Sequence, residues 1–314
     1  MTAANPESWP IAAAQAALEH TRRQLFPFRL ERWFLLGVAA FLDQCGRSAG
    51  GGAGGGAPPG GGAGGSRELL RLGGWWPLGS FELLLVCVAL GVGFVLLLLA
   101  LWLNSRGVFI YADGVATGRA ELSRPWREHR QRANDYFRWY LGLVVLTLGG
   151  VALVLAMGAA LALSADRRGF QPLLWLGVAL VVCLFVCLLV AASLASLLLR
   201  DFVAPVQWRR GIGCRAAIEH VLSLVARYPL AFLLYVLLKI VFAVVVGIVS
   251  ILAGCMTCCL GFLPVIRQTL LQPVFYFERA WSLFLLREMG EDPFPAAAGS
   301  PPLSAPPAPA SSRG

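Results

Sequence analysis

The sequence predicts an all-α polytopic membrane protein with about six transmembrane helices and amphipathic interfacial helices on the cytoplasmic side. Composition is the first reason: of 314 residues, 14% are charged and 58% hydrophobic, and the mean hydropathy is +0.70. Soluble chains carry about 25% charged residues. Long apolar runs, two of them without any charge, are the second reason. A soluble fold cannot cover its surface with so few charges, so globular, secreted disulfide-rich and disordered classes are excluded.

Six segments are predicted to span the membrane, since about 20 apolar residues at a rise of about 1.5 Å cross about 30 Å of hydrocarbon. The middle four are long and nearly free of charge. The first contains an apolar run of only ten residues before Asp43, and the last includes Arg267, Glu278 and Arg279. The predicted spans are residues 30–46, 81–103, 139–165, 170–199, 229–254 and 260–286.

The arginines decide whether the first segment crosses. If it does, sixteen arginines lie on the inner side and five on the outer; if it does not, the counts become twelve and nine. Because cytoplasmic loops carry an excess of Lys and Arg, we expect six spans with both termini in the cytoplasm. The net charge of +9 comes from arginines and a single lysine. We interpret it as a topology signal that attracts anionic lipid headgroups, and expect no nucleic-acid partner.

The parts outside the bilayer are of two kinds. A glycine-rich loop at residues 48–66 and a tail rich in Pro and Ala at residues 291–314 are predicted to be disordered. The remainder, residues 1–290, is expected to form a single membrane domain. Three segments with helical spacing of apolar residues are predicted to lie in the interface plane. They are the helix that begins near Trp9, Val108–Arg119 and Cys214–Ala226.

Lys239 is the first candidate for a functional residue. It lies ten residues after Pro229, about 15 Å by helical rise, which is near the bilayer midplane. A charge there costs at least about 2.5–3.5 kcal/mol on insertion scales. The lysine must therefore find a partner, lose its proton or line a wet cavity.

The last predicted span supplies the partner. Glu278 lies eleven residues after Arg267, close to three helical turns, so both occupy one face. Gln272 adds polarity nearby. Lys239, Arg267, Gln272 and Glu278 thus form a candidate intramembrane polar site between the last two helices, suited to an ion, a proton or a lipid headgroup. The alternative is a structural pair, because Arg279 adjoins Glu278 near the inner interface.

Other polar residues are given simpler interpretations. Arg200 and Asp201 close the fourth span and are expected to solvate a helix end, with a headgroup contact as the alternative. Cys255, Cys258 and Cys259 form a C-x-x-C group at an outer turn, but a zinc site needs four ligands. We expect small-residue packing there; thiol exchange and a disulfide with a neighbour stay open. No metal or cofactor is expected, and no triad is evident, so an enzyme is not expected.

Several strings resemble an uncharacterised family of multi-spanning bacterial membrane proteins. They are HTRRQLFPFRLERWFLLGVAAFL, RGVFIYADGVATGRA, RPWREHR, LLLRDFVAPVQWRRG, RYPLAFLLYVLLKIV, CMTCC and FERAWSLFLLREMG. The arrangement is similar, more distantly, to the membrane domain attached to some glycerophosphodiester phosphodiesterases. The resemblance covers residues 16–290 and implies a bacterial cytoplasmic (inner) membrane location. Its strings have no assigned chemistry, so it carries over no catalytic residue.

The sequence indicates a class of function and no specific substrate or partner. We expect a non-enzymatic membrane module that organises lipids or partner proteins, with anionic headgroups at the inner arginine-rich segments and a possible protein partner. The alternative is a small transporter or channel that uses the polar site between the last two helices. A water-accessible cavity at Lys239 would favour the alternative, and tight packing around it would weaken it.

Overall fold

The computed structural model describes residues 8–26, 28–45, 80–165, 171–256 and 268–294, and within these ranges every regular element is a helix. The elements are α1 (Trp9–Leu25), α2 (Leu30–Gln44), α4 (Ser80–Thr117), α5 (Ser123–Glu128), α6 (Arg130–Ala165), α7 (Gln171–Leu198), the π-helical turn η3 (Leu199–Val203), α8 (Ala204–Arg210), α9 (Cys214–Arg227), α10 (Pro229–Met256) and α12 (Gln272–Glu288). The predicted all-α class is therefore confirmed. The glycine-rich loop and most of the tail lie outside the described residues.

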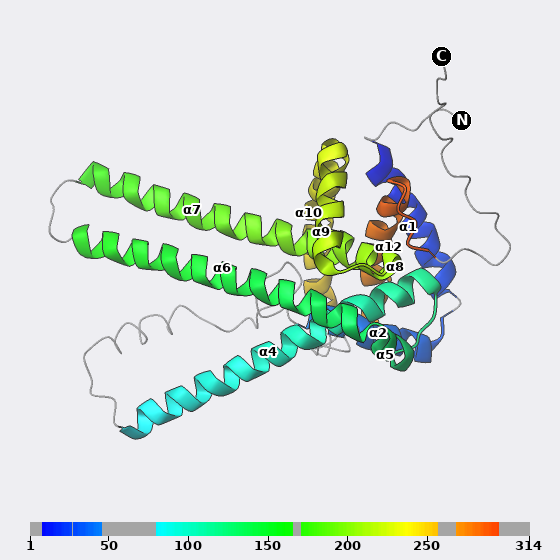
Figure 1. The fold of residues 1–314 in the computed structure, drawn as a ribbon, viewed down its shortest axis with the longest axis horizontal. Coiled ribbons are helices and arrows are strands. Elements are labelled where there is room, and N and C mark those ends of the chain that lie inside the picture. The colour runs from blue at the N-terminus through cyan, green and yellow to red at the C-terminus, as the bar shows by residue number, and fades with distance from the viewer. Residues whose placement is uncertain (1–7, 27, 46–79, 166–170, 257–267, 295–314) are drawn as a thin grey trace, which may run out of the picture.

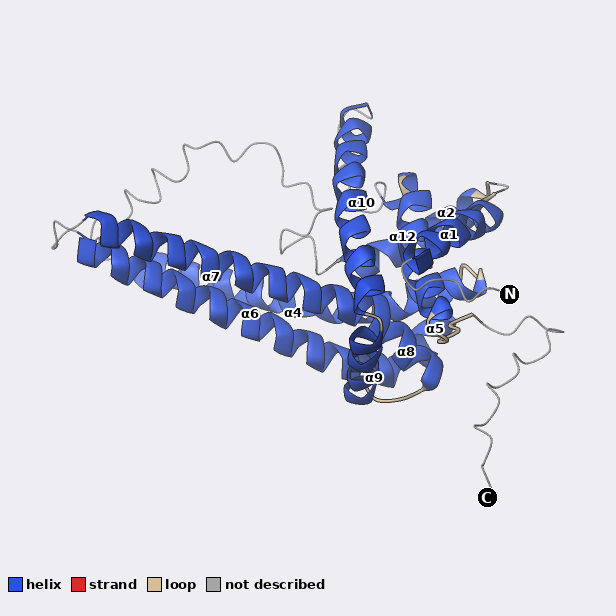
Figure 2. Cartoon of the chain, turned by 90° about the horizontal axis from the view of Figure 1, so that it is seen from above, coloured by secondary structure: helices blue, strands red, loops and turns tan. Residues whose placement is uncertain are grey.

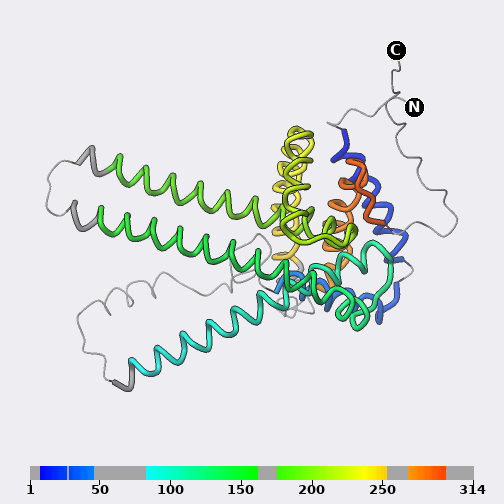
Figure 3. The backbone as a smooth tube through the Cα atoms, in the orientation of Figure 1, coloured from blue at the N-terminus to red at the C-terminus, as the bar shows by residue number. Residues whose placement is uncertain are grey.

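The long helices extend from a cluster of shorter ones (Figure 1). α6 and α7 lie side by side, while α4 leaves the cluster in a diverging direction. α10 runs across the direction of α6 and α7 in both views (Figures 1 and 2). The blue N-terminal helices lie beside the orange α12 in the backbone trace (Figure 3). The cluster is thus the meeting point of chain segments far apart in sequence.

Among the described residues, four helices are long and apolar enough to cross a membrane by length and composition: Leu83–Thr117, Arg130–Leu161, Trp175–Arg210 and Pro229–Leu252. They overlap the four middle spans expected from the sequence. The first predicted span forms α2, whose 15 residues extend about 22 Å at a rise of about 1.5 Å per residue. The last corresponds to α12 and to residues outside the described ranges. Six spans therefore stay a prediction.

The expected interfacial helix at Val108–Arg119 is wrong. These residues continue α4 without a break as far as Thr117, and Val108, Tyr111 and Val115 are fully buried. The reason is tertiary: α4 packs against α2, α8 and α12, and most residues of this segment are buried as a result. Gly118 ends the helix with a φ of 71°, a left-handed conformation that glycine adopts without strain.

α1 packs along α12. Ala13 and Ala17 are fully buried on α1, and their small side chains let the two helices approach closely. At one end of this contact, Trp281 Nε1 donates a hydrogen bond of 2.8 Å to the carbonyl oxygen of Pro10. Further along, His20 Nε2 donates to the carbonyl oxygen of Val115, at 2.9 Å. A predicted interfacial helix is thus joined to both α4 and α12.

His20 is expected to make the packing of α1 dependent on pH. Burial lowers the pKa of His20, and the charges of Arg23 and Arg32 lower it further, while the hydrogen bond to Val115 raises it. In the unfolded chain the His20 imidazole takes up a proton near pH 6.5. In the folded chain it does so only at lower pH. Stability is therefore expected to fall as the pH drops below about 6.5. Hydrogen exchange of α1 across this range measures the effect, and His20→Gln should flatten it. Equal pH slopes in the two proteins would contradict this assignment.

Gly107 marks the closest approach of α4 to α2. A Cβ at this position would lie 2.2 Å from the carbonyl carbon of Leu42 and 2.3 Å from the amide nitrogen of Asp43. Both are backbone atoms, so the helices would have to separate. We expect Gly107→Ala to lower the thermal midpoint of unfolding, measured by circular dichroism in detergent, by an amount corresponding to about 1–3 kcal/mol of overpacking.

Gly91→Ala is the matched control for this prediction. Gly91 lies in the same helix, but no described atom would lie within 4 Å of the added Cβ. Since alanine has a better helix propensity by about 1 kcal/mol, this variant should melt at the same or a higher temperature. A Gly107→Ala protein as stable as Gly91→Ala would show that α2 and α4 are not in contact here.

Candidate functional site

Six charged side chains from four segments meet inside the cluster, and we call them the charge network. They are Asp43 of α2, Arg200 and Asp201 of η3, Lys239 of α10, and Glu278 and Arg279 of α12. Three are acidic and three basic, so the formal charges balance. Five of the residues expose 8% or less of their surface, and the side chain of Glu278 exposes 16%. The network therefore joins distant elements through ions removed from solvent.

The π-helical turn explains how two adjacent charges both enter the core. Pro205 is the second residue after the turn. It has no N–H to donate, and its ring would clash with the carbonyl four residues earlier in a regular α-helix. The chain widens instead, and Ala204 N–H donates to the carbonyl oxygen of Leu199. Arg200 and Asp201 are both buried as a result, at 4% and 1% exposure.

Arg200 joins three elements. Its Nε lies 3.1 Å from Asp43 Oδ2 and 3.2 Å from Oδ1, and its Nη2 also donates to Oδ2. Its Nη1 donates to Glu278 Oε1 at 3.1 Å. The planar guanidinium matches a carboxylate in such a two-point contact, which orients the pair as well as stabilising it. One side chain thus connects α2, η3 and α12.

Lys239 brings in α10. Its Nζ donates to Asp201 Oδ2 and, at 3.1 Å, to Tyr235 Oη, and lies 3.2 Å from Glu278 Oε1. Tyr235 Oη in turn donates to Asp201 Oδ2 at 2.9 Å. Two hydrogen-bond acceptors and one further carboxylate oxygen thus surround an ammonium that carries three N–H groups. The lysine is therefore placed in a closed arrangement within the described part of the chain.

Arg279 completes the backbone hydrogen bonding around the turn. Its Nη1 donates to the carbonyl oxygen of Arg200 at 2.7 Å, and its Nη2 to that of Val108 at 3.1 Å. In a π-helix the carbonyl of Arg200 would accept from Pro205, which has no N–H. Because an unpaired buried carbonyl is costly, Arg279 stabilises the turn from α12. Its Nη1 also lies 3.7 Å from Asp201 Oδ1.

The structure brings together some of the residues predicted as a site. Lys239 and Glu278 are in contact. Gln272 is fully buried but lies beside α4, where its Nε2 donates to Tyr111 Oη at 3.3 Å. Arg267, Cys258 and Cys259 lie outside the described residues. Among those described, no group of three or more His, Cys, Asp or Glu side chains is arranged to hold a metal ion.

Two interpretations need correction. Arg200 and Asp201 were expected to solvate a helix end, which is wrong because α2, α10 and α12 cover that end of α7. The sequence gives Asp43 no role beyond ending the first apolar run, yet it is fully buried and bonded to Arg200. A signal existed in the sequence: Asp43, Arg200 and Asp201 all end apolar runs, and the later spans carry charges that need partners.

The fold and site define a helical protein with apolar helices compatible with a membrane, organised around a buried, balanced charge network. Residues 9–289 match the model of a family of unknown function (DUF7544), and the chain belongs to this family. No curated protein and no solved structure shows a significant match. These findings support the resemblance to an uncharacterised family; they give no support to a likeness to glycerophosphodiester phosphodiesterases or to a bacterial origin.

Proposed function

We propose that this protein is a non-enzymatic membrane module that organises anionic lipids, and through them or directly a partner protein. The observation that carries the proposal is the position of the exposed arginines. They lie on α1 and α2, around α5 and the start of α6, and on α8 and α9. They are Arg22, Arg23, Arg29, Arg119, Arg124, Arg127, Arg130, Arg138, Arg209, Arg210, Arg215 and Arg227, with Arg287 also exposed in the last turn of α12.

The apolar helices lead into this arginine-rich end. In Leu83–Thr117 and in Trp175–Arg210, the most apolar stretch of 18 residues has no residue buried inside the protein. Such surfaces suit lipid chains. A juxtamembrane Lys or Arg near an anionic surface contributes about 1 kcal/mol of attraction, so several together favour anionic over zwitterionic lipid. A bacterial inner-membrane location with both termini in the cytoplasm is the arrangement that we propose.

The alternative is a small transporter or channel with its polar site at Lys239 and Glu278. The partial exposure of Glu278 favours it. Against it, the amine of Lys239 is already bonded to Asp201 and Tyr235, and the neighbouring charges are paired with one another. A transport site needs groups that can exchange partners with a substrate, so we favour a structural role for the charge network.

Native mass spectrometry on the protein released from nanodiscs of mixed phosphatidylglycerol and phosphatidylcholine tests the lipid proposal. We expect stoichiometric phosphatidylglycerol to stay bound. Arg127→Gln/Arg130→Gln should reduce this retention, because Arg127 in α5 and Arg130 at the start of α6 are both exposed, and should leave phosphatidylcholine retention unchanged. Equal retention of both lipids by the unaltered protein would contradict the proposal. A retained small molecule that is not a lipid would favour the transporter.

A further inference from the structure

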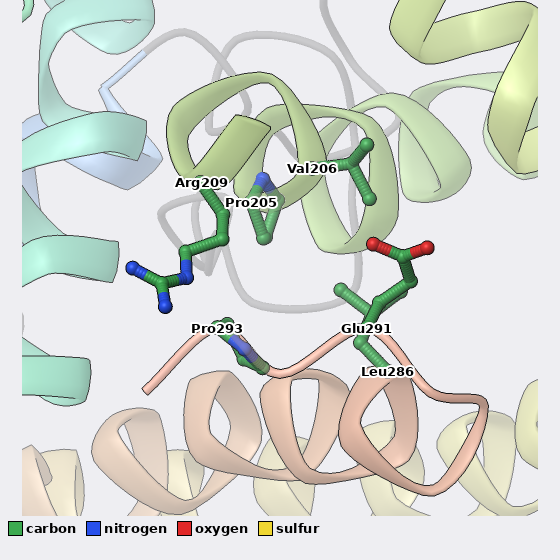
Figure 4. Close-up of a pocket in the computed structure, with 6 residues that line it drawn as sticks. All are labelled: Pro205, Val206, Arg209, Leu286, Glu291 and Pro293. Carbon is green, nitrogen blue, oxygen red and sulfur yellow. The ribbon is translucent and has the colours of Figure 1, made fainter. Parts of the chain in front are cut away.

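Residues Gly290–Phe294, which we call the strap, fold back from the end of α12 onto α8 and α9. Gly290 makes the turn with a φ of 90°. Arg209 Nε donates to the carbonyl oxygen of Asp292 at 3.0 Å, and Phe294 packs on Phe284 with ring centroids 4.6 Å apart. Figure 4 shows Glu291 and Pro293 of the strap facing α8 across a small cavity.

The carboxylate of Glu291 is the polar centre of this contact. Arg210 donates to it through Nε, at 2.9 Å from Oε2, and through Nη2 to Oε1. His220 Nε2 lies 2.8 Å from Oε1. The side chain of Glu291 exposes only 16%, whereas Arg210 exposes 45% and His220 26%. The anion is therefore more enclosed than the groups that bind it.

Arg210 and His220 favour the ionised form of the Glu291 side chain. Burial alone would raise the pKa of Glu291, but the hydrogen bonds from Arg210 and His220, together with their charges, hold it below its ordinary value. The strap therefore carries a carboxylate anion at neutral pH. A carboxylate and a phosphate accept the same two-point contact from a guanidinium.

The position of these cations fits a headgroup. Arg209 and Arg210 follow the buried residues of η3 and α8 and are exposed at the surface of the helix cluster, at the arginine-rich end that we propose faces the headgroup layer. The half-buried Trp208 adjoins them, and tryptophan is enriched at that depth. An anionic group from the membrane would meet the same donors that now bind Glu291.

We propose that Arg210 and His220 form a binding site for the phosphate of an anionic lipid, and that Glu291 occupies this site in the structure as an internal competitor. The inference rests on the proposed function and adds a specific site and its control. Lipid phosphate replaces the Glu291 carboxylate on Arg210 and His220, and the strap leaves by rotation at Gly290. No covalent bond changes.

The test is a titration of the purified full chain in neutral detergent with short-chain phosphatidylglycerol. Glu291→Gln removes the competing charge, and we expect it to bind about tenfold more tightly than the unaltered protein, as follows if the strap leaves the cations free about one-tenth of the time. Glu219→Gln is the matched control. It makes the same charge change on α9, at an exposed carboxylate paired with Arg215, and should leave the affinity unchanged.

A third variant identifies the site. Arg210→Gln/Glu291→Gln should lose the gain in affinity, because it lacks the guanidinium that would bind the phosphate. Equal affinities for Glu291→Gln and Glu219→Gln would overturn the competitor role, even if phosphatidylglycerol still binds elsewhere. An equal gain for inorganic phosphate would overturn the lipid assignment. Failure of every variant to prefer phosphatidylglycerol over phosphatidylcholine would instead overturn the proposed function as well.

Discussion

Arg200→Met is expected to lower the free energy of unfolding by about 3–5 kcal/mol, the cost of removing one partner from a buried ion pair. The substitution keeps a side chain of similar length but deprives Asp43 of its guanidinium contact and Glu278 of its ion pair with Arg200. Asp43 is fully buried, so solvent cannot replace the lost contact. Chemical denaturation in mixed micelles, followed by circular dichroism, measures the change.

Arg215→Met is the control for Arg200→Met. Arg215 forms an i,i+4 pair with Glu219 on the surface of α9, with side chains 79% and 64% exposed. Exposed pairs of this kind contribute at most about 1 kcal/mol. The two variants make the same chemical change in opposite environments. Similar losses of stability would mean that the charge network is not sealed from solvent.

Lys239→Met is expected to have the second large effect, again about 3–5 kcal/mol, because it leaves the carboxylates of Asp201 and Glu278 without their ammonium. Asp201→Asn alone should also destabilise. The double variant removes both members of the pair, so its cost should be smaller than the sum of the single costs by about 1–3 kcal/mol. Additive costs would contradict direct coupling. A fully stable Lys239→Met protein would point to a role in transport rather than in structure.

Much of the helical organisation was predictable because apolar length is a local property. The four long runs appear as α4, α6, α7 and α10. The continuation of α4 to Thr117 was not predictable from the same signal. Its polar residues are typical of an interface helix, and only the packing of α2, α8 and α12 around it makes the segment part of the core.

The candidate site was partly predictable for a related reason. A lysine inside an apolar run must have a partner, and that requirement pointed to Glu278. Arg200 and Asp201 were misinterpreted because charges at the end of a span normally meet water. The π-helical turn before Pro205 brings both charges inward, and α2 and α12 cover them. This cover depends on contacts between distant segments.

Lys239 is sealed within the charge network, and the reactivity of its amine tests this directly. It is the single lysine of the chain, so a small amine-reactive reagent reads this one side chain by mass spectrometry. In lipid bilayers at neutral pH, we predict that Lys239 stays unmodified under conditions that modify it fully after unfolding in guanidinium, because its exposure is 8% and its amine is bonded to Asp201 and Tyr235. Rapid modification in the folded protein would contradict a sealed network and favour a water-accessible site at Lys239.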